Sequence, residues 1–384
     1  MAVRIPAKRW TRWVPALVAG VVVVAGAVAI PAAANASATL PDKTPAQVIG
    51  LVQNDKVTAF SGTIEQSSDL GLPSVQGLSA GGQGSVSSSG SGSSASLASV
   101  LELVTGSHTV RVFVDGPKNL RAQIMDQLAE RDVIRHGSDV WIYDSKAGTA
   151  EHATISAKAG GKAGAKTGER MPSQATTPKT PAQIAELLLA QLRPSSTVRV
   201  GEQVTVAGRS AYNLVLKPRS TDSLLGSVSI AVDGATGMPL RVQLTARGSD
   251  TAAVSVGFSA ITLAKPAASL FAFTPPKSAT VKQLTPPKKS DAQKPDGTAK
   301  SRKADAAKPK VAVSGSGWDS VVTVSGATQL ASLQKSPQFA ELTTTVAGGR
   351  LFHTTLVNIL FLDDGRIVAG SVPAAQLESA ASAK

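Results

Sequence analysis

One pentapeptide of this chain, Gly77-Leu78-Ser79-Ala80-Gly81, matches the pattern that carries the nucleophile of serine hydrolases. In that G-x-S-x-G elbow a strand precedes the serine and a helix follows it. Both flanks of Ser79 are instead rich in serine and glycine, which is typical of loop. The chain's four histidines are scattered, and the sequence places none of them beside an aspartate as a catalytic partner. We therefore predict no enzyme activity and no catalytic residue.

The composition narrows the possible chemistry further. There is no cysteine, which excludes a disulfide framework, a thiol nucleophile, a zinc-thiolate site and a lipid-modified N-terminal cysteine. No pattern of metal ligands is present either, and we expect neither a metal nor a cofactor.

The net charge of +13 is concentrated in segments that do not look like folded domains. Residues 1–38 carry +4, residues 157–182 carry +4 and residues 282–310 carry +6, which leaves −1 for the rest of the chain. Nucleic-acid binding needs a basic patch on a folded surface. We therefore expect no nucleic-acid partner and interpret the two internal basic segments as solvated linkers.

The first 38 residues have the features of a targeting segment. Four basic residues precede an uncharged stretch of seventeen residues, 14–30, and small residues follow Pro31. This pattern predicts a signal peptide cleaved after Ala36 or Ala38, with an uncleaved N-terminal membrane anchor as the alternative. In both cases we expect the rest of the chain to be exported, in the cell envelope or secreted, with a membrane surface nearby.

The side chains beyond residue 39 alternate in the manner of an antiparallel sheet. Val110, Val112 and Val114 fall on one face of a strand and polar residues on the other, which indicates one buried side. Further strands begin near Phe60, near Leu120 and at Asp139, and another group of strands follows residue 196. The fold class is therefore α+β, with a curved antiparallel sheet.

Two similarly built helices flank the first group of strands. Each opens with the tetrapeptide Thr-Pro-Ala-Gln, at Thr44 and at Thr180, which has a capping threonine and proline at the first helical position. The apolar stripe of the first helix, with Val48 and Val52, predicts packing against the sheet.

The domain organisation follows from these patterns. We expect a signal peptide or anchor at 1–38 and a half-barrel domain at 39–281, with disordered insertions at about 73–98 and 157–180. A Lys/Pro/Ala linker spans 282–312, and a small C-terminal segment spans 313–384. In that segment Asp363-Asp364-Gly365 lies between two apolar runs and predicts a β-hairpin.

Short motifs occur in a fixed order along residues 44–281. They are F-x-G-x-x-x-Q from Phe60, Gly116-Pro117, G-x-x-x-W-x-Y-D from Gly137, Y-x-L-x-L-x-P from Tyr212, V-D-x-x-T-G-x-P-L-R from Val232 and F-x-F-T-P-P from Phe271. Together they resemble the LolA/LolB-like superfamily of periplasmic lipoprotein carriers and the related RseB-type sigma-factor regulators.

The resemblance implies an incomplete, half-open barrel with helices over its concave face and an apolar groove that holds acyl chains. The residues that we expect to line the groove are Phe60, Ile64, Phe113, Trp141, Tyr143, Leu214, Leu216, Phe258 and Phe271. For Trp141 and Phe113, core packing is the competing interpretation. Gly116 occupies the place where the carriers have a lid-latching arginine, so their opening mechanism does not carry over. Arg121 lies nearby, and we expect it to face solvent.

Two functions remain open at this point. The first is an exported, non-enzymatic carrier that binds lipid or an acylated lipoprotein in the groove. The second is an RseB-like regulatory or interaction module at the outer face of the cytoplasmic membrane, which binds a membrane-anchored partner protein through the C-terminal hairpin.

Overall fold

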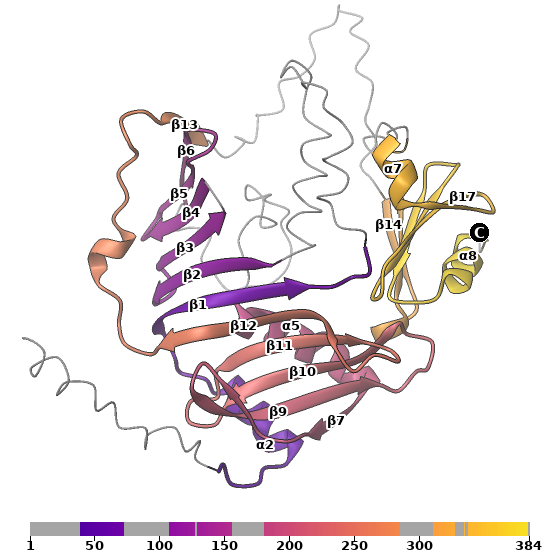
Figure 1. Cartoon of the computed structure of the whole chain (residues 1–384), viewed down its shortest axis with the longest axis horizontal. Helices are drawn as coiled ribbons and strands as arrows, with labels where there is room; N and C mark the ends of the chain where they lie inside the picture. The colour runs from indigo at the N-terminus through magenta and orange to yellow at the C-terminus, as the bar shows by residue number, and fades with distance from the viewer. Residues whose placement is uncertain are drawn as a thin grey trace, which may run out of the picture. The chain divides into compact units, whose positions relative to one another are not determined.

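The computed structural model describes residues 39–72, 107–126, 129–155, 180–284, 310–326, 334 and 337–382. The predicted targeting segment, the Ser79 motif and most of both predicted insertions lie outside these residues. The described part contains a 13-stranded sheet and a 6-stranded sheet (Figure 1).

The larger sheet is curved and does not close on itself. Its strands lie in the order β13-β6-β5-β4-β3-β2-β1-β12-β11-β10-β9-β7, with β8 paired to β9. Their bounds are β1 Ala59–Ser68, β2 His108–Asp115, β3 Asn119–Asp126, β4 Ala129–His136, β5 Asp139–Asp144, β6 Thr149–Thr154, β7 Ser196–Val200, β8 Val204–Val206, β9 Arg209–Pro218, β10 Leu225–Asp233, β11 Pro239–Ala246, β12 Ala252–Thr262 and β13 Thr280–Leu284. Within the described residues the terminal strands β13 and β7 do not pair, so the predicted α+β half-barrel is confirmed.

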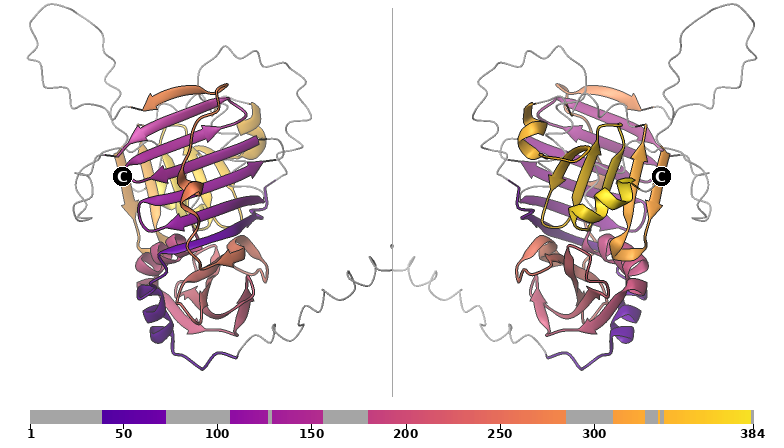
Figure 2. Two further views of the ribbon diagram at one scale, coloured as in Figure 1. Left: turned by 90° about the vertical axis from the view of Figure 1, so that its left-hand side faces the viewer. Right: turned by 90° about the vertical axis from the view of Figure 1, so that its right-hand side faces the viewer.

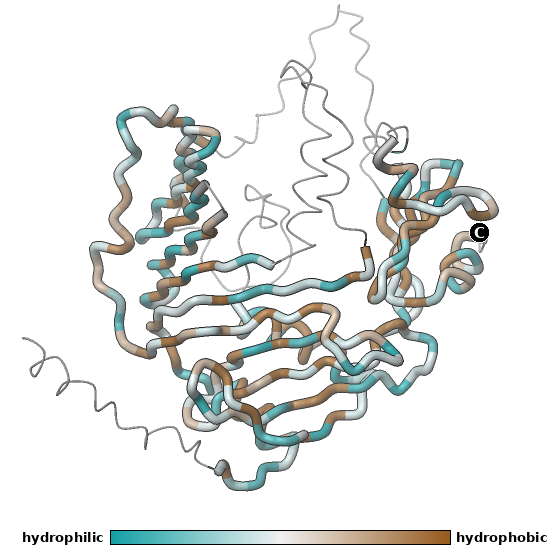
Figure 3. Tube along the Cα trace, in the orientation of Figure 1, coloured by the Kyte–Doolittle hydropathy of each residue, from teal (hydrophilic) through white to brown (hydrophobic). Residues whose placement is uncertain are grey.

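Both predicted helices are present and begin as expected. Helix α2 (Pro45–Gln53) and helix α5 (Pro181–Leu192) each start with a complete capping box, in which Thr44 and Thr180 are the N-caps. The helices pack on the sheet through one buried cluster, which joins Val48, Ile49, Val52, Ala185 and Leu189 to Tyr212, Leu214, Leu216, Val228, Ile230 and Val232. Hydrophobic and polar residues alternate along the strands beneath them (Figure 3).

A long strap follows β12 and crosses the sheet on the other face. It contains the short 3-10 helix η3 (Ala268–Phe271), which contacts β3 and β4, and it ends in β13 (Figure 2, left). Strand β13 pairs in parallel with β6, whereas the other pairs of this sheet are antiparallel. The strap thus connects the centre of the sheet to its far edge.

The C-terminal segment forms its own sheet with its own core. The strand order is β14-β15-β19-β18-β17-β16. The bounds are β14 Lys310–Ser314, β15 Val321–Ser325, β16 Thr344–Val346, β17 Gly349–His353, β18 Asn358–Leu362 and β19 Ile367–Gly370, with the helices η4 Gly317–Asp319, α7 Pro337–Leu342 and α8 Ala374–Ser382. Helix α8 packs on one face through Leu377 and Ala381. The predicted hairpin at Gly365 joins β18 to β19.

Specific contacts join this segment to the half-barrel. Trp318 is buried in the cluster beneath α2 and α5, and its Nε1 donates a hydrogen bond of 2.7 Å to Ser196 Oγ. The backbone N–H of Leu224 donates to the carbonyl of Ser371, and that of Thr355 donates to the carbonyl of Leu70.

Some details differ from the sequence-based expectations. Strand β4, Ala129–His136, was not predicted, because four charged residues obscure its alternation. Strands β13 and β14 occupy the two ends of the predicted linker. Arg121 does not face solvent, because Asp132 and the strap enclose it.

Candidate functional site

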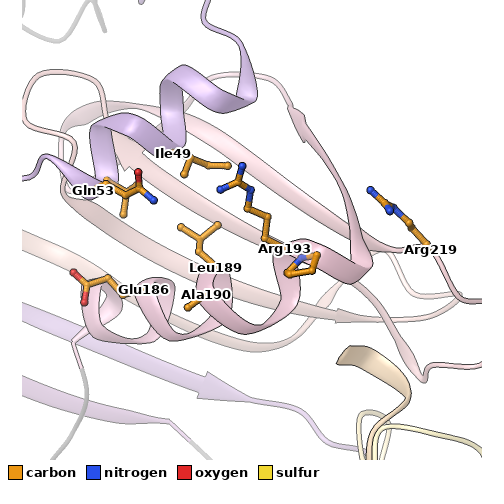
Figure 4. Close-up of a pocket in the computed structure, with 9 residues that line it drawn as sticks. Ile49, Gln53, Glu186, Leu189, Ala190, Arg193 and Arg219 are labelled. Atoms are coloured by element: carbon orange, nitrogen blue, oxygen red, sulfur yellow. The ribbon is translucent and has the colours of Figure 1, made fainter. Parts of the chain in front are cut away.

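A cavity of about 500 Å³ lies between helices α2 and α5 (Figure 4). The nine residues that line it are Ile49, Val52, Gln53, Glu186, Leu189, Ala190, Arg193, Pro194 and Arg219. Since both helices have an apolar stripe facing the sheet, the cavity forms where their flanks meet above that layer. Its walls therefore combine apolar and charged side chains.

The apolar part of the lining is firmly held. Ile49, Val52 and Leu189 are buried and belong to the cluster that fixes both helices on the sheet. These side chains cannot turn away without opening the core, which makes the apolar wall largely pre-formed. Preformed apolar walls with a few polar groups are typical of small-molecule sites.

Two arginines give the cavity a cationic end. Figure 4 shows Arg193 and Arg219 on one side and Gln53 with Glu186 on the other. Arg193 follows the last residue of α5 and opens the 3-10 helix η2 (Arg193–Ser195). The backbone N–H of Arg219 donates to the carbonyl of Ser195 over 3.1 Å, which brings the end of β9 beside the end of α5.

Neither guanidinium has a side-chain partner among the described residues. Arg193 and Arg219 are exposed, and Glu186, the acidic residue of the lining, forms no ion pair with them. Guanidinium groups bind carboxylate and phosphate through paired hydrogen bonds. The cavity therefore has an apolar wall for hydrocarbon and a cationic end for an anion.

The residues predicted to line a groove lie on two faces of the sheet. On one face Phe60, Ile64 and Phe258 belong to a buried cluster in the middle of the sheet, and Leu214 and Leu216 lie beneath the helices. Phe113, Trp141, Tyr143 and Phe271 lie on the strap side. None of the nine lines the cavity between α2 and α5. Their role in binding a ligand stays a prediction.

The strap side is packed with aromatic rings. Phe273 of the strap lies 5.5 Å from Trp141 and 5.7 Å from Tyr143, measured between ring centroids. The ring of His152 stacks on Trp141 at 4.2 Å, and its two nitrogens lie 3.0 Å from Asp139 Oδ1 and from Gln283 Oε1. These contacts fix the strap on the sheet.

An ion pair is buried beneath the same strap. Arg121 pairs with Asp132 and donates a second hydrogen bond to the carbonyl of Leu270. Asp132 is only 1% exposed. Burial raises the pKa of Asp132 above its ordinary value, although Arg121 opposes the shift by its charge and its hydrogen bond. The pair links β3, β4 and the strap.

The cavity has no clear signature in the sequence. Arg193 and Arg219 belong to no motif and lie 26 positions apart in the sequence. The repeated Thr-Pro-Ala-Gln opening of the two helices was the available signal, because two similar amphipathic helices on one sheet have a furrow between them.

The described residues contain no group of three or more potential metal ligands. None of the helices described is both long enough and apolar enough to span a membrane. Ser79 lies outside the described residues.

Comparison with known proteins finds similarity only at the level of solved structures. No family model and no curated protein sequence matches the chain. The complex of MucA with MucB from Pseudomonas aeruginosa contains a chain that is 14% identical, with a TM-score of 0.41, over 87% of this chain and 96% of that one. A second structure of MucB with MucA(peri) gives 15% identity and a TM-score of 0.39, with coverage of 87% and 96%.

A LolA superfamily protein from Nitrosomonas europaea is also similar. It is 9% identical, with a TM-score of 0.22, over 60% of this chain and 99% of that one.

Proposed function

We propose that the protein is an exported, non-enzymatic binding protein for an anionic amphiphile, such as a lipid or the acyl chain of a lipoprotein. The hydrocarbon occupies the space between α2 and α5, and the anionic group lies at Arg193 and Arg219. The observation that carries the proposal is the cavity itself, which joins a buried apolar wall to two guanidinium groups without side-chain partners among the described residues.

Burial of the hydrocarbon chain supplies enough free energy for binding, and no catalytic residue is needed. Each buried methylene contributes about 0.8 kcal/mol, so a chain of about ten methylenes contributes roughly 8 kcal/mol before the costs of association. The arginines add a preference for an anion, since charge-assisted hydrogen bonds are stronger than neutral ones. Export is proposed from the N-terminal targeting pattern.

The test compares three amphiphiles with equal chains: dodecyl phosphate, dodecanol and dodecyltrimethylammonium. Binding is measured by isothermal titration calorimetry on residues 39–384, the form that leader cleavage after Ala38 leaves. We expect dodecyl phosphate to bind most tightly. Replacing Ala190, which lines the cavity, by tryptophan should weaken binding by at least about tenfold, because the indole fills the space for roughly two methylenes.

Matched variants separate the site from general effects. Leu187→Trp adds the same ring to α5 at an exposed position outside the lining and should leave binding unchanged. Arg193→Gln with Arg219→Gln should lower affinity for dodecyl phosphate but not for dodecanol, whereas Lys217→Gln should change neither. Full binding of dodecyl phosphate by Ala190→Trp would show that the cavity is not the site.

A second candidate function is an interaction module that binds a membrane-anchored partner through the C-terminal segment. The observation that favours it is that this segment forms a sheet with its own core. Val357→Lys, at an exposed apolar residue of this segment, should then weaken partner binding and leave amphiphile binding intact, since Trp318 and Leu356 stay in the cluster beneath α2 and α5. Loss of amphiphile binding in this variant would contradict the separation of the two functions.

A further inference from the structure

Among the described strands, β14 has the most exposed apolar side chains. All five of its residues, Lys310–Ser314, are exposed. Val311 is 63% exposed and Val313 is 64% exposed, more than any other large hydrophobic side chain in the described part of the chain. The two valines form the most exposed apolar pair on any described strand.

Among the described residues, the backbone of β14 pairs along one side only. The strand pairs with β15 and stands at the end of the sheet, with no further described strand beyond it. Alternate residues of such an edge direct their N–H and C=O groups outward. The five residues pair with β15 without a register shift, so no bulge twists the edge away. The edge is therefore able to accept another strand.

Two other edges, β13 and β16, carry the usual protection. The last strand of the larger sheet, β13, is also exposed, but Lys282 occupies its centre. At the far end of the C-terminal sheet, β16 has three residues, and Arg350 donates hydrogen bonds to Thr343 and Thr345 beside it. Only β14, among these edges, presents an uncharged Val-Ala-Val centre.

We propose that β14 binds an extended, acidic peptide segment of a partner protein by strand addition. Val311 and Val313 lie on one face beside Val324 and Val322 of β15. A peptide with β-branched residues at alternate positions would extend this strip of valines, since directly opposed side chains on one face pack together. This inference does not depend on the cavity between the helices.

The positive charge of β14 and of the sequence before it favours an acidic partner. Lys310 begins the strand, β14 contains no acidic residue, and residues 282–310 carry a net charge of +6. A second copy of this chain would bring another such stretch alongside, and like charges repel, whereas an acidic peptide is attracted. The occupant is therefore a foreign acidic strand.

The strand is also held in place. Ser314 Oγ lies 3.4 Å from the carbonyl of Val321, to which it donates, and Trp318 anchors the chain in the half-barrel four residues later. A fixed edge loses little conformational freedom when a peptide is added.

The probe is a fluorescein-labelled peptide, Glu-Val-Thr-Val-Thr-Glu, measured by fluorescence anisotropy with residues 39–384. Binding should occur and should slow amide hydrogen exchange in residues 310–314. The double variant Val311→Ser, Val313→Ser should weaken binding roughly tenfold, because it removes two apolar cross-strand pairs without adding charge. Both side chains are exposed, so folding is retained, which circular dichroism checks.

The matched control is Val281→Ser, which makes the same change on another exposed edge, where Val281 is 53% exposed. It should leave binding unchanged. A peptide N-methylated at alternate residues should not bind. Equal binding by the double serine variant, binding of the methylated peptide, or no binding by the wild type would each overturn the proposal. Dimer formation that the double variant abolishes would assign the edge to a second copy instead.

Discussion

At the scale of single residues, two buried aspartates with arginine partners behave differently. Asp233 accepts hydrogen bonds from Arg209 at 2.9 and 2.8 Å and from Thr236 Oγ1 at 2.6 Å. Burial by itself raises the pKa of Asp233, but the bonds from Arg209 and Thr236 outweigh it and hold the pKa below 3.8. For Asp132 burial dominates, and its pKa is raised.

The two shifts have opposite consequences for stability at low pH. The stabilisation from Asp233 is fully present above its unfolded pKa near 3.8 and is lost as the pH falls through the lower, folded value. Asp132 has the opposite effect. As the pH falls through its raised pKa, the carboxylate is protonated and the free-energy cost of its buried charge is removed.

We expect Asp233→Asn to lower the free energy of unfolding by roughly 2 kcal/mol at neutral pH, because it weakens the charge-assisted hydrogen bonds that the half-buried Arg209 donates to the buried carboxylate. Urea denaturation measures this value. Asp364→Asn is the matched control: Asp364 also pairs with an arginine, Arg366, but the pair is exposed. It should change stability little. Equal effects of the two substitutions would contradict the account of Asp233.

At the scale of secondary-structure elements, the features that depend on a few adjacent residues could be predicted from the sequence. They are the capping boxes at Thr44 and Thr180 and the turns at Asp233 and Gly365. Strand β4 could not be predicted, because Asp132 appears polar in sequence and is buried only through Arg121 of β3.

The candidate site was harder to predict than the sheet. The cavity requires the end of β9 to lie beside the end of α5, and the strap requires β13 to pair with β6, 131 positions away in the sequence. Such contacts between distant segments leave no periodic pattern. The nine predicted groove residues were chosen for their apolar character, which identifies buried positions but does not show which of them border a cavity.

One prediction concerns helix α5, which supplies one wall of the cavity. Thr180→Ala should lower the free energy of unfolding by about 1 kcal/mol, because the threonine Oγ1 accepts the N–H of Gln183 at the first turn. Thr180→Ser keeps the acceptor and should retain most of that stability. Thermal denaturation followed by circular dichroism compares the two. If alanine and serine were equally destabilising, the capping bond would not be the cause.

At the scale of the whole molecule, Trp318 and Leu356 carry the C-terminal segment into the buried cluster of the half-barrel. The C-terminal sheet buries Val321, Leu360, Val368 and Leu377 in a cluster of its own. Trp318 instead belongs to the cluster of the half-barrel, and its indole donates to Ser196, whose hydroxyl donates to the last carbonyl of α5. The contact between the two parts therefore lies at the end of α5, next to Arg193.

We expect Trp318→Ala to undock the C-terminal sheet without unfolding it. Truncating a buried tryptophan costs roughly 3–5 kcal/mol, and here the loss falls on the junction and not on the cluster around Leu360. In hydrogen exchange, the amides of Leu224 and Thr355, which donate across the junction, should lose protection. The amides paired between β17 and β18 should keep theirs.

Trp141→Ala provides the control for this experiment. It removes an equally large ring, but on the strap side of the half-barrel, where Trp141 contacts Phe273 and His152. Leu224 and Thr355 should stay protected in that variant. Protection of both amides in Trp318→Ala would show that the remaining contacts hold the junction alone. Loss of protection throughout β17 and β18 would show that the C-terminal sheet depends on the half-barrel for its fold, because its own core is then too small to sustain it.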